Sequence, residues 1–87
     1  MPYITQEQRE PLDAVIQRLS EMIDDEGELN YTITCLLHLE VKKLGKNYAT
    51  LNKVQGVMDC ASREFYRKVV APYEDQKIKI NGDVDVL

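Results

Sequence analysis

Apolar residues recur every three or four positions along three stretches of this 87-residue chain, and this spacing constrains its fold more than any other feature. The stretches cover residues 12–23, 29–44 and 48–70. A spacing of this kind places the apolar side chains on one face of an α-helix. Short turn-forming segments rich in Asp, Gly and Asn separate the stretches. The sequence therefore predicts an all-α chain of three main helices, with antiparallel neighbours because the connections are short.

Pro72 interrupts the third and longest of these helices. Proline has no backbone N–H, and it disfavours the helical conformation in the preceding residue, which is Ala71. We therefore expect helix 3 to be kinked or broken near Pro72 and to continue as a short segment that ends at Asn81 and Gly82. The whole chain, residues 1–87, is predicted to be a single domain, with an N-terminal arm and first turn at 1–10 and a C-terminal tail at 83–87.

Several residues predict where the helices begin and end. Thr5 and Gln8 have the spacing of a capping box, and Pro11 is expected in the first turn that follows. The second helix is expected to begin near position 28 or 29 and to end at Gly45, which suits the residue after a helix. Asn47 is the expected cap of the third helix.

Composition excludes several classes of protein. The chain has 15 Asp and Glu against 11 Lys and Arg, a net charge of −4, which argues against nucleic acid or a membrane surface as the main partner. No stretch has the length of a membrane span, and the N-terminus does not have the pattern of a signal peptide. Cys35, Cys60 and His38 are too few for a structural zinc site. We therefore expect a cytoplasmic protein with no cofactor and no bound metal.

The third helix predicts an assembly of several copies. Its apolar and aromatic residues cover more than one face, and two other helices cannot easily cover so wide a surface. Gly56 lies in mid-helix, where glycine costs about 1 kcal/mol relative to alanine, and close approach of another helix would offset that cost. We therefore predict a helical homo-oligomer. The interface candidates are Tyr48, Leu51, Gly56, Phe65, Tyr66, Val70 and Tyr73.

Three acids, Glu64, Glu74 and Asp75, are the candidates for a catalytic role. Carboxylates on helices hold magnesium in all-α nucleotide pyrophosphohydrolases, so a magnesium-dependent enzyme of that kind is one alternative function. The same acids also have ordinary structural roles. Glu64 is spaced to pair with Lys68, while Glu74 and Asp75 fall in the first turn after Pro72, where acids suit the helix dipole.

A second alternative is a nucleic-acid accessory factor. Arg63, Tyr66, Arg67 and Lys68 combine positive charge with an aromatic ring, as single-stranded nucleic acid requires. The acidity of the chain weighs against this function. The sequence identifies no small-molecule ligand.

Nearly the whole chain resembles a family of small uncharacterised proteins of tailed phages and bacteria. The resemblance is carried most strongly by Glu64-Phe65-Tyr66-Arg67, by Pro72-Tyr73-Glu74-Asp75 and by Asn81-Gly82-Asp83. It implies no activity, cofactor or catalytic residue. The leading interpretation is therefore a small non-enzymatic interaction or accessory protein, of phage or bacterial origin, that associates with itself.

Overall fold

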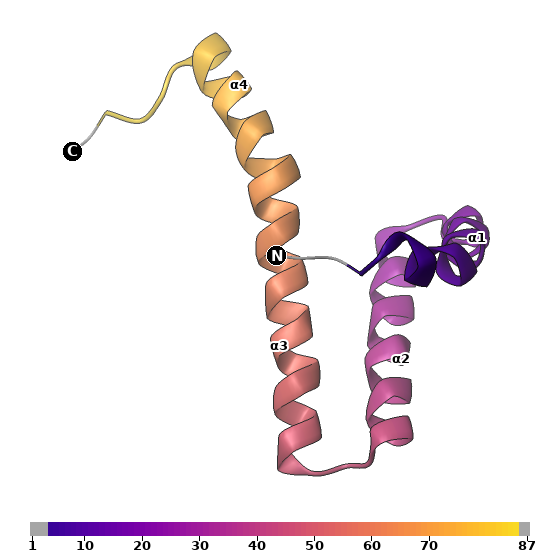
Figure 1. The fold of residues 1–87 in the computed structure, drawn as a ribbon. Helices are drawn as coiled ribbons and strands as arrows, with labels where there is room; N and C mark the ends of the chain where they lie inside the picture. Colours follow the sequence, from indigo (N-terminus) through magenta and orange to yellow (C-terminus); the bar gives the residue numbers. More distant parts are fainter. Residues whose placement is uncertain (1–3, 86–87) are drawn as a thin grey trace. The chain divides into compact units, whose positions relative to one another are not determined.

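The computed structural model describes residues 4–85, which contain helices and no strand, so the predicted all-α class is confirmed. In chain order the helices are α1 (Gln6–Met22), α2 (Glu26–Leu44), α3 (Tyr48–Phe65), the π-helical turn η1 (Tyr66–Val70) and α4 (Ala71–Asn81) (Figure 1). The contacts between residues divide the chain into two units, one through Val54 and one from Gln55 onward. Helix α3 begins in the first unit and continues into the second.

The predicted capping box opens α1. The Thr5 hydroxyl oxygen accepts a hydrogen bond from the backbone N–H of Gln8 at 3.2 Å, and the Gln8 side chain accepts one from the N–H of Thr5 at 2.9 Å. The position expected for Pro11 was wrong, because α1 already begins at Gln6 and Pro11 lies beyond its first turn. There the proline ring provides no N–H for the carbonyl of Glu7, so the helix lacks one of its backbone hydrogen bonds.

Helix α2 begins two residues before the earliest position expected from the sequence. The reason is a cap at Asp25, whose carboxylate accepts a hydrogen bond from the N–H of Glu28 at 2.7 Å. The Glu28 carboxylate in turn accepts one from the N–H of Asp24 at 2.7 Å. The end of the helix was predicted correctly. Gly45 has a φ of 99°, which favours glycine, and its N–H donates to the carbonyl of Val41 at 2.8 Å.

Within the first unit, Figure 1 shows α1 nearly end-on beside the start of α2, which runs in the plane of the view. The antiparallel arrangement expected for these two helices is therefore wrong. The chain reverses after Gly45, and Asn47 caps α3 as predicted by accepting a hydrogen bond from the N–H of Thr50 at 2.9 Å. Thr50 is 6% exposed, and it is the one residue of the described range that counts as buried.

In the second unit, the break expected near Pro72 takes the form of a π-helical turn. The N–H of Ala71 donates to the carbonyl of Tyr66, five residues back instead of four. A proline in a regular helix clashes with the carbonyl four residues before it, and the wider turn makes room for the ring of Pro72. Helix 3 is thus a joined, kinked helix made of α3, η1 and α4, and it ends at Gly82 with a φ of 85°.

The two units share one feature, which is the lack of a buried apolar core. Among residues 4–85, no apolar residue is buried. The helices of both units therefore keep much of their apolar faces in contact with solvent. Within the same residues, no helix is both long and apolar enough to cross a membrane.

Candidate interaction surface

The π-turn brings Tyr66 and Glu74 together. The Tyr66 hydroxyl donates a hydrogen bond of 2.7 Å to the Glu74 carboxylate, although the two residues are eight positions apart. Two regular helical turns span about 7.2 residues, so one extra residue is needed to return Glu74 to the side of Tyr66. The bond and the charge of Glu74 raise the pKa of Tyr66 above its ordinary value of 10.0, and partial desolvation and the charge of Asp75 add to the shift.

Glu64 forms a bidentate ion pair with Arg67. The Arg67 guanidinium donates to the Glu64 carboxylate through Nη2 at 2.6 Å and through Nε at 3.4 Å. The Glu64 side chain is only 12% exposed, whereas that of Arg67 is largely exposed. This pairing is three residues apart, and the pairing of Glu64 with Lys68 that the sequence suggested stays a prediction. Forked arginine–carboxylate contacts fix the orientation of both side chains.

The three candidate catalytic acids are not gathered at one place in a single chain. Allowing for the extra residue of the π-turn, Glu64 and Glu74 lie about 180° apart around the helix. They bind different partners, Arg67 and Tyr66, and Asp75 is the neighbour of Glu74. Within residues 4–85 no group of three or more His, Cys, Asp or Glu side chains could hold a metal ion. A catalytic role for these acids stays a prediction, and the chain's geometry adds nothing in its favour.

Most of the predicted interface residues are exposed to solvent. Phe65 and Tyr73 are 61% and 59% exposed, and Tyr48, Leu51 and Tyr66 are exposed as well. The other two, Gly56 and Val70, are half-buried. A Cβ added to Gly56 would meet nothing within 4 Å in this chain, so the chain itself supplies no reason for a glycine there.

Two further exposed residues were not among the interface residues predicted from the sequence. Val69 is 53% exposed and Ile80 is 74% exposed, and both belong to the second unit. On a regular helix Ile80 would lie about 60° from Phe65, so its spacing was already a usable signal, although it was not selected.

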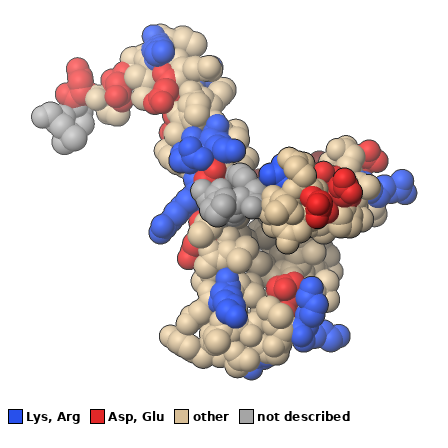
Figure 2. All heavy atoms as spheres, in the orientation of Figure 1, with Lys and Arg blue, Asp and Glu red and all other residues tan. Residues whose placement is uncertain are grey.

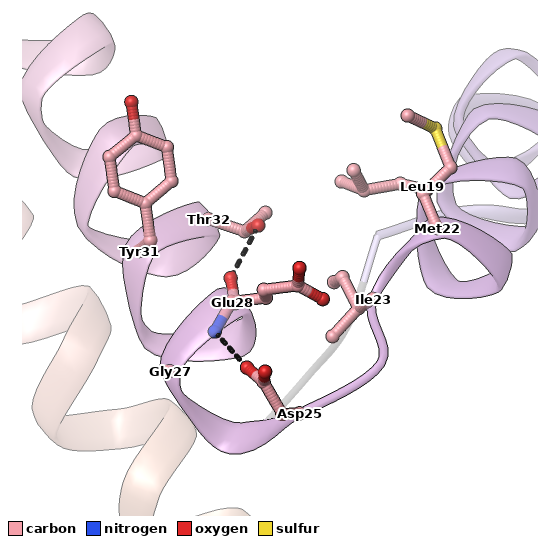
Figure 3. Close-up of a pocket in the computed structure, with 8 residues that line it drawn as sticks. All are labelled: Leu19, Met22, Ile23, Asp25, Gly27, Glu28, Tyr31 and Thr32. Atoms are coloured by element: carbon pink, nitrogen blue, oxygen red, sulfur yellow. Dashed lines mark hydrogen bonds between the residues drawn. The ribbon is translucent and has the colours of Figure 1, made fainter.

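The first unit contains an open hollow where the end of α1 meets the start of α2 (Figure 3). Its volume is about 440 Å³, and its apolar wall comes from Leu19, Met22 and Ile23. On the α2 side, polar side chains make hydrogen bonds to the backbone of α2 itself. The Thr32 hydroxyl, for example, donates to the carbonyl of Glu28 at 2.8 Å. Tyr31 also lines the hollow, and a hydrogen bond with Cys35 raises the pKa of its phenol above 10.0.

Charges of both signs are interspersed on the face shown in Figure 2, with wide uncharged areas between them. Arg67, one of the residues predicted for nucleic-acid binding, lies in the contact with Glu64 described above. A basic stripe long enough to follow a phosphate backbone is not visible on this face. Nucleic-acid binding through Arg63, Tyr66, Arg67 and Lys68 stays a prediction, as does an interface made by the exposed apolar side chains of helix 3.

A protein-family model described as Domain of unknown function (DUF6899) matches residues 1–84. No curated protein and no solved structure is significantly similar to the chain.

Proposed function

Because the chain belongs to the family described as Domain of unknown function (DUF6899), which brings no activity with it, we propose a function from the chain's own surface. We propose that it is a small non-enzymatic helical interaction protein that associates with copies of itself through helix 3. The proposal includes a cytoplasmic setting and a phage or bacterial origin, which rest on the acidic composition and on the resemblance in sequence.

The observation that carries the proposal is the missing core. Ordering each residue of a chain costs about 1–2 kcal/mol of conformational entropy, and burial of apolar surface is the main term that offsets it. Within residues 4–85 no apolar side chain is buried. Short isolated helices are marginal in water, because packing of an apolar face supplies most of their stability. A second chain that covers these faces would supply the missing burial.

Two features favour a further copy of the same chain as the partner. The net charge of −4 is small, and acids and bases are interspersed, so two copies repel each other weakly. The exposed aromatic residues Phe65, Tyr66 and Tyr73 occupy one short part of the second unit. Aromatic side chains of this kind are enriched at the centres of protein interfaces.

Sedimentation velocity of the purified chain, over a range of micromolar concentrations, tests the proposal. Self-association predicts a sedimentation coefficient that rises with concentration toward that of a dimer or a larger assembly. A chain that stays monomeric throughout, whether folded or unfolded, would refute it. An unfolded monomer would point to a different protein as the missing partner, whereas a folded monomer would show that no partner is needed.

A further inference from the structure

We infer that helix 3 of one copy pairs with helix 3 of a second copy in antiparallel orientation, with the two chains crossing near Val69. The inference rests on the proposed self-association and specifies its surface and geometry. It follows from three observations in the second unit, which are the π-turn, the line of mostly exposed side chains that this turn creates, and the symmetry of that line about Val69.

The first observation is the extra residue in η1. Two contacts report it independently: the N–H of Ala71 bonds to the carbonyl five residues back, and Tyr66 reaches Glu74 eight residues ahead. Each residue of an α-helix turns the chain by about 100°. One inserted residue therefore rotates everything after Ala71 by about 100° relative to α3.

The second observation is the effect of this rotation on the apolar side chains. On a regular helix, Tyr73 would lie about 80° from Phe65 and Ile80 about 60° from it. With the inserted residue, both lie within about 40° of Phe65 and form one line with the residues before it. This line, called the stripe below, also includes the half-buried Met58 and the cation of Lys77. Its members are Met58, Ala61, Phe65, Val69, Tyr73, Lys77 and Ile80.

The third observation is that the stripe is symmetric about Val69. Phe65 and Tyr73 lie four residues to either side of it, and Ala61 and Lys77 lie eight residues to either side. Met58 and Ile80 lie eleven residues to either side. A twofold axis through Val69 makes the interface of two identical chains self-complementary. Each residue on one side of Val69 then meets the residue at the same distance on the other side of Val69 in the second chain.

The resulting pairs match in size and chemistry. Phe65 faces Tyr73 of the other copy on both sides of the axis, and aromatic pairs of this kind favour association beyond the area that they bury. The Lys77 ammonium already lies 5.5 Å from the centre of the Tyr73 ring in its own chain. Antiparallel pairing sets the stem of Lys77 against Ala61, the smallest residue of the stripe, so that the charged end can reach water.

A parallel pair in register lacks this complementarity. Every residue would then face its own copy, so the two Lys77 ammonium groups would meet inside the interface and repel each other. The small Ala61 side chains would also face each other and leave a gap, since no larger residue fills the space. Charge and packing therefore both favour the antiparallel orientation over the parallel one.

Site-directed cross-linking tests the orientation. The experiment uses the full chain with Cys35 and Cys60 replaced by serine, single cysteines placed in the stripe, and a short bismaleimide reagent. Val69→Cys should cross-link to itself. Met58→Cys and Ile80→Cys should each give little product alone and should give a covalent pair when the two variants are mixed. Sedimentation of each variant shows whether it still associates.

The outcomes separate this inference from the proposed function. Efficient self-linking of both Met58→Cys and Ile80→Cys would show a parallel pair and overturn the inference while self-association stands. Associated chains in which Val69→Cys does not cross-link would show that another face makes the contact. A chain that sediments as a monomer before any substitution overturns the proposed function, and the orientation with it. Ile78→Cys, which lies off the stripe, is the matched control and should not cross-link in any mixture.

Discussion

Truncation of Phe65 should weaken self-association far more than truncation of a comparable residue elsewhere on the same unit. Phe65 is 61% exposed in the single chain. A covered phenylalanine buries on the order of 200 Å², so about 120 Å² of this residue remains for a partner to cover. Phe65→Ala keeps the Cβ atom and removes roughly 100 Å² of that surface. At about 25 cal/mol per Å², the loss is about 2.5 kcal/mol for each chain.

A symmetric pair contains the residue twice, so the loss per pair is about 5 kcal/mol. Because each 1.4 kcal/mol changes an equilibrium constant tenfold, the dissociation constant should rise by roughly 10³–10⁴-fold. Sedimentation equilibrium over a wide concentration range measures this change directly. Circular dichroism on the same samples shows how much helix the variant retains.

Ile78→Ala is the matched control, because Ile78 is an exposed apolar residue of α4 that lies off the stripe. It should change the dissociation constant by less than about threefold, as expected for a residue outside an interface. The reasoning is refuted if Phe65→Ala and Ile78→Ala weaken association equally. It is also refuted if Phe65→Ala leaves the dissociation constant unchanged, since the stripe would then not be the contact.

Three other substitutions test separate parts of the account. Gly56→Ala should stabilise the helix by about 1 kcal/mol and leave association unchanged, because an added Cβ meets open space; weaker association in sedimentation would instead place a partner helix against Gly56. Pro72→Ala removes the clash that favours the π-turn, so α4 should rotate off the stripe and the dissociation constant should rise about tenfold or more; an unchanged constant would count against the register argument. Glu74→Gln should lower the raised pKa of Tyr66 toward 10.0, measured by the NMR titration of its ring. Because that pKa is raised by folding, its stabilising contribution is present below pH 10 and is lost as pH rises through the folded value; a Tyr66 titration that Glu74→Gln does not move would contradict the bond.

The sequence predicted the elements of this fold well, because local chemistry determines them. The side chains of Thr5 and Asn47 suit the start of a helix, and each caps one as predicted. The backbone freedom of Gly45 suits the end of a helix, and Gly45 ends α2 as predicted. The start of α2 was predicted too late, because the cap is supplied by Asp25, inside the segment that was assigned to the turn.

The arrangement of the surface was harder to predict than the elements. Pro72 indicated that helix 3 is not regular. A kink, a break or an extra residue in the turn can each accommodate a proline, so the sequence did not decide between them. Only the extra residue brings Tyr66 to Glu74, and it moves Tyr73 from about 80° to about 20° from Phe65. A helical wheel drawn at a constant 100° per residue therefore misplaces every side chain after Ala71. This explains why Tyr73 was selected only as part of a broad surface.

The central claim is that association supplies the core that a single chain lacks, and thermal unfolding at several concentrations tests it most directly. A protein that folds as it associates has a Tm that depends on concentration. The account predicts that the Tm followed by circular dichroism rises steadily as the wild-type chain is concentrated across the micromolar range. A Tm that is the same at every concentration, with a cooperative loss of helix, would show that one chain folds alone and would contradict the account.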